Sequence, residues 1–173
     1  MELENFYVRV AELINAKPKE IAFVENATRA WDMIFYSIPL KAEDQIITVR
    51  SEYGSNVIAY LHRAKQTGAE LVILENNDDG EPDTDQLRKL INKKTKLISM
   101  SHIPTGGGLV NPANEIGAIA NEYGVPYLLD ACQSVGQMSV DVADIGCDFL
   151  SATGRKFLRG PRGTGFLYVK QDW

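Results

Sequence analysis

Hydrophobic residues follow two alternating spacings along the chain. Five stretches carry them at intervals of three and four, as one face of a helix does. These stretches are residues 6–14, 27–38, 57–64, 87–91 and 116–123. Between them lie apolar runs of strand length, namely Ile21–Val24, Ile46–Val49, Leu71–Leu74, Leu97–Met100, Tyr127–Leu129 and Phe166–Val169. The alternation predicts one α/β domain over residues 1–173, a three-layer α/β/α arrangement around a mixed, mostly parallel sheet.

Residues that commonly cap helices stand at the ends of two of the predicted helices. Asn111 and Pro112 are typical of the N-cap and first position of a helix, and Gly124 is typical of its end. Asp83 or Thr84 is suited to cap the helix of residues 87–91. The pattern therefore predicts where these two helices begin and where one of them ends.

Composition narrows the class of protein. The chain has 173 residues, 45% of them hydrophobic, and a formal net charge of −5 without a basic stripe. This favours a globular protein, neither disordered nor a partner of nucleic acid. We expect no membrane segment and no signal peptide, because apolar runs are short and the start is not basic. Cys132 and Cys147 form neither a disulfide framework nor a metal motif, which favours the cytoplasm.

In parallel sheets, ligands bind beyond the carboxyl ends of the strands, so the residues after each apolar run are the ones to inspect. Lys156 lies in a loop before the last run, directly after Thr153, Gly154 and Arg155. Hydroxyl, backbone N–H and guanidinium groups bind phosphate, and a lysine beside other cations is a usable nucleophile toward an aldehyde. A solvated basic loop with glycine turns is the alternative reading.

A carboxylate, Asp130, ends the run Tyr127–Leu129. A buried acid is costly unless a charge accompanies it, and a protonated pyridine nitrogen would serve as that charge. Gln133, three residues later, is suited to donate to a phenolic oxygen on the same ring. The alternative is an aspartate that only caps a strand–loop junction.

Three further segments follow apolar runs. Ala27 and Thr28 open a helix whose N-terminal amides suit a phosphate, unless Asn26 or Thr28 only caps it. Tyr53 is placed to stack on an aromatic cofactor, although packing is the commoner role. Thr105 precedes three glycines and is suited to contact a ring oxygen. An amine, a buried acid, a phosphate site, an aromatic face and an amide on one rim together indicate pyridoxal 5′-phosphate.

The sequence resembles the class V aminotransferases, which are fold type I pyridoxal-phosphate enzymes. The most specific segments are DACQSVG, residues 130–136, and TGRKFLRGPRGTGFLYV, residues 153–169. The resemblance implies that Lys156 forms the Schiff base with the cofactor, Asp130 pairs with the pyridine nitrogen and Gln133 contacts the phenolic oxygen. It implies phosphate binding by Ala27, Thr28 and Thr153. It also implies an amino-acid substrate, a homodimer, and a C-terminal small domain that is absent from this sequence.

The branch within the family is a separate question. Cysteine desulfurases usually carry histidine where Tyr53 and Arg155 stand. The segments SEYGSN, HIPTGGGLVNP and TGRKFLRGPRGTG look more like isopenicillin-N epimerase-like enzymes and the C–S lyases of ergothioneine biosynthesis. We therefore expect transamination, epimerisation or C–S lysis, with Lys156 as general base. Alternatives are a cysteine desulfurase, an inactive dimerisation or scaffold module, and a nucleotide-binding α/β domain.

Overall fold

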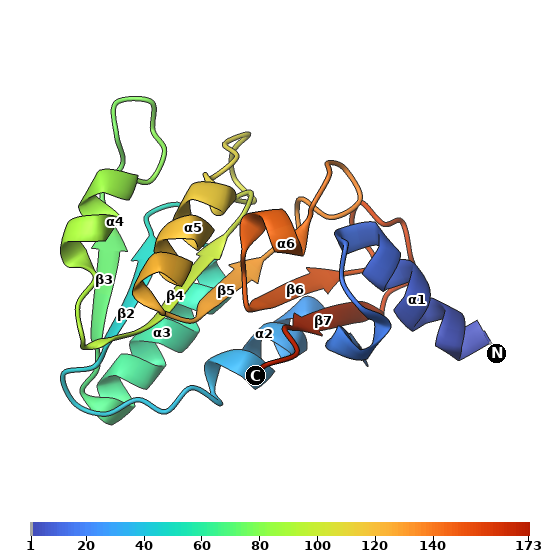
Figure 1. Cartoon of the computed structure of the whole chain (residues 1–173), viewed down its shortest axis with the longest axis horizontal. Helices are drawn as coiled ribbons and strands as arrows, with labels where there is room; N and C mark the ends of the chain where they lie inside the picture. The colour runs from blue at the N-terminus through green and yellow to red at the C-terminus, as the bar shows by residue number, and fades with distance from the viewer. Residues whose placement is uncertain (1) are drawn as a thin grey trace.

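The computed structural model describes residues 2–173, which form a seven-stranded sheet flanked by helices (Figure 1). The helices are α1 (Glu2–Ile14), the 3₁₀ helix η1 (Pro18–Glu20), α2 (Ala27–Phe35), α3 (Gly54–Thr67), α4 (Thr84–Leu90), α5 (Ala113–Tyr123) and α6 (Val142–Ile145). The strands are β1 (Ile21–Val24), β2 (Gln45–Val49), β3 (Glu70–Leu74), β4 (Thr95–Ser101), β5 (Tyr127–Asp130), β6 (Phe149–Thr153) and β7 (Gly165–Val169).

The sheet is mixed and mostly parallel, as the alternation predicted. Its strand order is β1-β7-β6-β5-β4-β2-β3, and only β7 runs against its neighbours β1 and β6. The pairs β2/β3, β2/β4, β4/β5 and β5/β6 are parallel. The carboxyl ends of six strands therefore lie along one edge of the sheet, which is where ligand sites of such sheets form.

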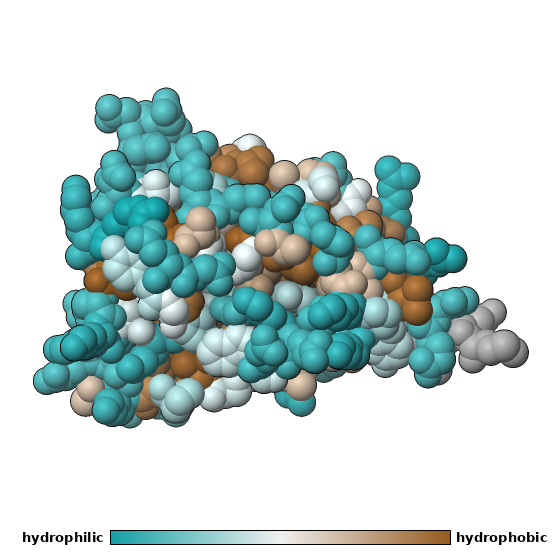
Figure 2. All heavy atoms as spheres, in the orientation of Figure 1, coloured by the Kyte–Doolittle hydropathy of each residue, from teal (hydrophilic) through white to brown (hydrophobic). Residues whose placement is uncertain are grey.

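Helices cover both faces of the sheet, and one hydrophobic core lies between the sheet and each layer of helices. On one face of the sheet, α1, α4, α5 and α6 pack through residues such as Ile14, Leu87 and Ile116. On the other face, α2 and α3 pack through Trp31 and Tyr60, whose rings meet edge to face at 5.3 Å. In the view of Figure 2 the outer surface is mostly hydrophilic, as expected for helices that turn only one side to the sheet. Within residues 2–173, no helix has the length and apolar character needed to cross a membrane.

The helix ends agree with the predicted caps at two of three places. Asp83 accepts a hydrogen bond from the Gln86 N–H at 2.9 Å and caps α4, and Gly124 ends α5 in the left-handed conformation. The predicted start of α5 was wrong by one residue. Pro112 is the N-cap, because the Asn111 side chain instead donates to the Ser101 carbonyl at 2.6 Å.

Strand β6 was not among the predicted apolar runs. Its residues Phe149–Thr153 are all buried, yet only the first two are large and apolar. Ser151 and Thr153 take inward positions in the strand, where a periodicity of apolar residues does not reveal them. This strand matters because it leads directly into the Lys156 loop.

We predict that Gly117→Ala destabilises the fold. A Cβ at Gly117 in α5 would lie 1.8 Å from the Ile145 carbonyl oxygen, so the two helices would have to move apart. We expect a loss of about 1–3 kcal/mol in the free energy of unfolding, measured by denaturant titration. The control is Gly54→Ala in α3, where an added Cβ meets nothing within 4 Å. Equal stability of the two variants would contradict the close packing.

Candidate active site

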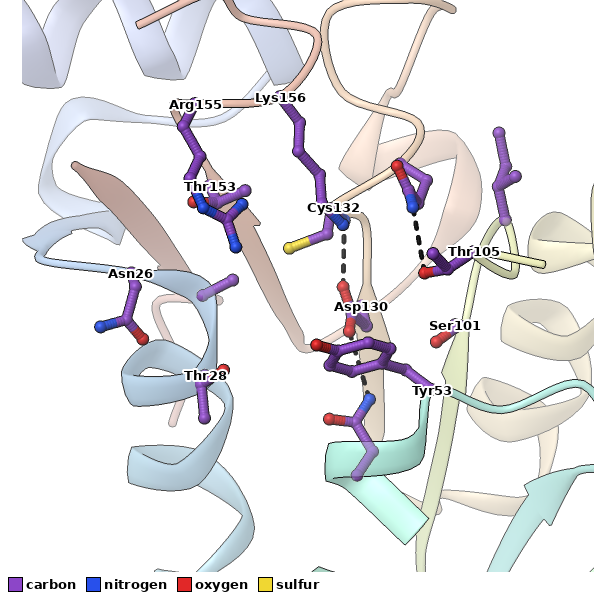
Figure 3. A pocket seen from close by; sticks show the side chains of 14 residues that line it. Asn26, Thr28, Tyr53, Ser101, Thr105, Asp130, Cys132, Thr153, Arg155 and Lys156 are labelled. Atoms are coloured by element: carbon purple, nitrogen blue, oxygen red, sulfur yellow. Dashed lines mark hydrogen bonds between the residues drawn. The ribbon is translucent and has the colours of Figure 1, made fainter. Parts of the chain in front are cut away.

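A cavity of about 450 Å³ opens at the carboxyl edge of the sheet (Figure 3), a volume in the range of small-molecule sites. Its lining comes from the ends of β1, β2, β4, β5 and β6 and the segments after them. The lining residues are Asn26, Ala27, Thr28, Tyr53, Asn56, Ser101, Ile103, Thr105, Asp130, Cys132, Gln133, Thr153, Arg155 and Lys156. All nine residues that the sequence singled out therefore meet in one pocket.

The Lys156 loop is held by close backbone packing. Gly136, at φ 92°, lies so near the Phe157 backbone that a Cβ there would be 2.7 Å from the Phe157 carbonyl carbon. Gly154 is similarly tight, with 2.3 Å between a built Cβ and the Thr164 hydroxyl oxygen. The Gly160 N–H also donates to the Gly154 carbonyl at 2.7 Å. The loop between β6 and β7 is thus fixed over the pocket.

Lys156 and Arg155 extend from this loop into the pocket, and Tyr53 reaches it from the start of α3 (Figure 3). The Lys156 Nζ lies 6.0 Å from the centroid of the Tyr53 ring. Tyr53 is 41% exposed and lines the cavity, so part of the residue is open to a ligand there. The amine and the aromatic face thus border the same space.

Asp130 ends β5 on the pocket floor and is 7% exposed. Its Oδ1 accepts from the Cys132 N–H at 3.0 Å, and its Oδ2 accepts from the Asn56 Nδ2 at 3.2 Å. Both donors are neutral, and no Lys, Arg or His nitrogen among the described residues forms an ion pair with it. The pocket therefore holds a buried carboxylate without a cationic protein partner, which favours a cationic ligand.

The opposite side of the pocket is suited to an anion. Asn26 caps α2 by accepting from the Arg29 N–H at 2.8 Å. The Ala27 and Thr28 amides belong to the first turn, whose N–H groups have no acceptor within the helix. Thr28, Thr153 and Arg155 line the same wall (Figure 3). Asn26 is therefore a cap, as the alternative reading expected, and the helix start also faces the cavity, so phosphate binding there stays a prediction.

A polar pair lies between the two walls. Gln133 Nε2 donates to Thr105 Oγ1 at 3.0 Å. The amide and the hydroxyl come from loops after β5 and β4, as the sequence predicted. This hydrogen bond brings together the two side chains that we expect to contact the ring oxygen.

Sequence reasoning missed four residues that line the pocket: Asn56, Ser101, Ile103 and Cys132. Ser101 and Ile103 follow the rule of strand ends, since β4 ends at Ser101, and that rule could have found them. Asn56 sits in the first turn of α3 and resembles a surface residue in sequence, yet it is 3% exposed.

The two cysteines lie in different parts of the structure, but the pKa of both thiols is raised. Cys147 is buried in the core, whereas Cys132 is partly buried and lines the pocket beside Asp130. Burial raises the pKa of Cys132 well above its usual range, and the Asp130 charge raises it further while Lys156 opposes this. Burial also raises the pKa of Cys147, to about 12. Both thiols are therefore protonated near neutral pH.

The fold and the pocket define an α/β domain that joins a lysine, a buried carboxylate and an anion site at one sheet edge. Residues 2–173 match the sequence model of the family described as aminotransferase class-V. The chain belongs to this family, whose cofactor is pyridoxal phosphate.

Similar proteins are named cysteine desulfurases. A probable cysteine desulfurase from Synechocystis is 40% identical over 95% of this chain and 40% of its own length. The apo structure of a cysteine desulfurase from Thermococcus onnurineus superposes with a TM-score of 0.90 at 32% identity, covering 98% of this chain and 42% of its own. A cysteine desulfurase from Escherichia coli gives 0.90 at 28% identity, covering 98% and 43%. The chain thus spans about two fifths of the length of these relatives.

We predict that both thiols react slowly with iodoacetamide in the folded protein. Because the raised pKa values leave little thiolate, alkylation near pH 8 is expected to be at least about tenfold slower than in denaturant. Mass spectrometry of peptides containing Cys132 and Cys147 gives both rates. Rapid labelling of Cys132 without denaturant would contradict the protonated state inferred for the pocket.

Proposed function

We propose that this chain forms the pyridoxal-phosphate site of an enzyme that acts on a sulfur-containing amino acid, with Lys156 as the catalytic residue. The observation that carries the cofactor site is the buried Asp130 carboxylate, which lacks a cationic partner among residues 2–173 and faces the Lys156 pocket. A protonated pyridine nitrogen would supply that charge.

The residues present fit the cofactor at each of its polar groups. We propose that Ala27, Thr28, Thr153 and Arg155 hold the phosphate through hydroxyls, helix N-terminal amides and a guanidinium. Thr105 and Gln133, bonded at 3.0 Å, are placed to contact the phenolic oxygen. Tyr53 would cover one face of the ring.

The cofactor, when bound, supplies an aldehyde that condenses with amines and a protonated ring that accepts electrons. In our proposal the Lys156 Nζ would hold this aldehyde, and the same amine would take the proton from the substrate α-carbon. The Asp130 carboxylate would favour the protonated form of the ring nitrogen. The close packing at Gly136 and Gly154 would hold the backbone of the Lys156 loop at the edge of the pocket.

We propose cysteine as the substrate, because the similar proteins above are named cysteine desulfurases. These names favour the desulfurase alternative over the epimerase-like branch that the motifs had suggested. In a desulfurase reaction the carbon–sulfur bond of cysteine breaks, a proton replaces sulfur to give alanine, and the sulfur passes to an acceptor thiol as a persulfide. Cys132 is a poor acceptor, since its raised pKa keeps the thiol protonated.

A C–S lyase is the second candidate, favoured by Tyr53 and Arg155 at positions where desulfurases usually carry histidine. A lyase breaks the same bond, but water then releases pyruvate and ammonia alongside sulfide. The homodimer expected from the family resemblance also stays a prediction, which the molecular mass in solution tests.

We predict that Lys156 is the residue that binds the cofactor covalently. Purified protein mixed with pyridoxal phosphate turns yellow, and borohydride then fixes one cofactor to the Lys156 peptide, as read by mass spectrometry. Lys156→Ala abolishes this adduct, whereas Lys89→Ala, a change at an exposed lysine in α4, leaves it intact.

Other results would point elsewhere. A folded chain that stays colourless would support the scaffold alternative, and retention of ATP or NAD would support the nucleotide-binding one. An adduct on a different lysine would refute the role of Lys156.

We predict that L-cysteine gives alanine when the loaded protein is supplied with dithiothreitol as acceptor thiol. Alanine and sulfide in equal amounts support desulfuration, because dithiothreitol releases the transferred sulfur as sulfide. Pyruvate and ammonia would identify a lyase instead. Binding of the cofactor without turnover of cysteine, while another amino acid reacts, would refute the sulfur substrate and leave the cofactor site standing. Lys156→Ala is the control for each product.

A further inference from the structure

A partly buried hydrogen-bond chain, Glu52–Asn56–Asp130, borders the pocket. Asn56 Nδ2 donates to Glu52 Oε1 at 3.1 Å and to Asp130 Oδ2 at 3.2 Å. An amide nitrogen carries two hydrogens, so it can serve both acceptors at once. Figure 3 marks the bond that enters Asp130 from this side. One amide therefore bridges two carboxylates.

Glu52 is firmly held at the far end of this chain. Its Oε1 accepts from the Tyr53 N–H at 2.6 Å, and its Oε2 accepts from the Ser101 N–H at 3.0 Å. The Ser101 hydroxyl also donates to it, and Thr48 and Tyr60 hydroxyls lie at 3.3 and 3.4 Å. Backbone N–H groups cannot become acceptors, so both carboxylate oxygens are needed. A glutamine would set its own NH₂ against one of these donors.

This anchor fixes the direction of the Asn56 amide. With Glu52 accepting one hydrogen, the Nδ2 side of Asn56 is kept toward the carboxylates, and the second hydrogen points at Asp130. Asp130 is then bonded at both oxygens, since Oδ1 accepts from the Cys132 N–H. Two bonds on different oxygens set the plane of the carboxylate.

The Asn56 amide lies between two acidic side chains, so it has an electrostatic effect as well as a packing one. Burial raises the pKa of Glu52, the hydrogen bonds from Ser101, Tyr53 and Asn56 lower it, and the Asp130 charge raises it again. The two acids therefore oppose one another at short range, and the shared amide is the group between them. Removal of that amide would leave Asp130 with one hydrogen bond and a repelling neighbour.

We propose that Asn56, oriented by Glu52, is a positioning residue that holds the Asp130 carboxylate in the plane where it meets the ring nitrogen of the cofactor. This rests on the proposed function, in which Asp130 pairs with that nitrogen. Neither the sequence motifs nor the family resemblance gave Asn56 or Glu52 a role in the site.

The test compares two ligands that differ in one atom: pyridoxal phosphate and its analogue with CH in place of the ring nitrogen. Asn56→Ala should weaken binding of pyridoxal phosphate at least about tenfold, the order of one lost hydrogen bond to a buried charge. Binding of the analogue should change less than about twofold. Glu52→Gln should also lower the affinity for pyridoxal phosphate relative to the affinity for the analogue. Absorbance titration of the apoprotein measures both affinities.

The matched control is Asn121→Ala in α5. Asn121 Nδ2 also donates to two acceptors, the Gly117 and Gly146 carbonyls, each at 2.9 Å, but lies away from the pocket. Its loss should lower the unfolding temperature and leave the affinity ratio unchanged. Asn56→Ser, a milder change, gives the same ratio test should Asn56→Ala fold poorly.

Each outcome has a distinct meaning. Equal weakening of both ligands in folded Asn56 variants would show a merely structural role and overturn the inference, as would no weakening. Wild-type protein that binds neither ligand would refute the proposed function itself. Wild-type protein that binds both ligands equally would refute the pairing of Asp130 with the ring nitrogen.

Discussion

The burial of Asp130 without a cationic side chain is the constraint around which the site is arranged. Its carboxylate ends β5, between β4 and β6 in the sheet, and its two hydrogen bonds come from neutral groups. Burying an ionised carboxylate in this way is costly unless a positive charge arrives from outside the protein. Proteins keep such costly groups at functional positions, which supports the proposed cofactor site.

Sheet topology brings the other groups to this carboxylate. Because six strands run in one direction, the segments after them share a single edge, although they are separated by up to about 130 positions in sequence. The reversed strand β7 gives the lysine its place. Its antiparallel pairing with β6 makes the segment of residues 154–164 a return loop at the same edge, and Lys156 extends from that loop into the pocket.

Much of the fold followed from the sequence because its strands are distinct apolar runs. The run Ile46–Val49 is an example, and its ends were right within one residue. Strand β6 was not predicted because Ser151 and Thr153 are polar residues at buried positions. The start of α5 was misplaced because Asn111 bonds to the end of β4, a contact between segments that are not adjacent in sequence before folding.

The candidate site was predictable to the extent that its groups follow strand ends, as Asp130 and Thr105 do. Asn56 and Glu52 were not, since their importance comes from a tertiary network and both residue types are ordinary at the start of an exposed helix. Residue roles toward the cofactor came from the family resemblance, because a pocket lining specifies which groups meet but not what they bind.

The pocket residues shared by the family do not decide which reaction the enzyme catalyses. A lysine base and an aspartate at the ring nitrogen serve every pyridoxal-phosphate reaction of this kind, so Lys156 and Asp130 do not select among them. Position 53 does bear on the choice. An imidazole exchanges protons near neutral pH. In our proposal Tyr53 stands over the ring where desulfurases usually carry histidine, so it supplies an aromatic face but not an imidazole. If cysteine is the substrate, the proton transfer would fall to another group that borders the pocket, and we propose the Lys156 Nζ, which lies 6.0 Å from the centroid of the Tyr53 ring.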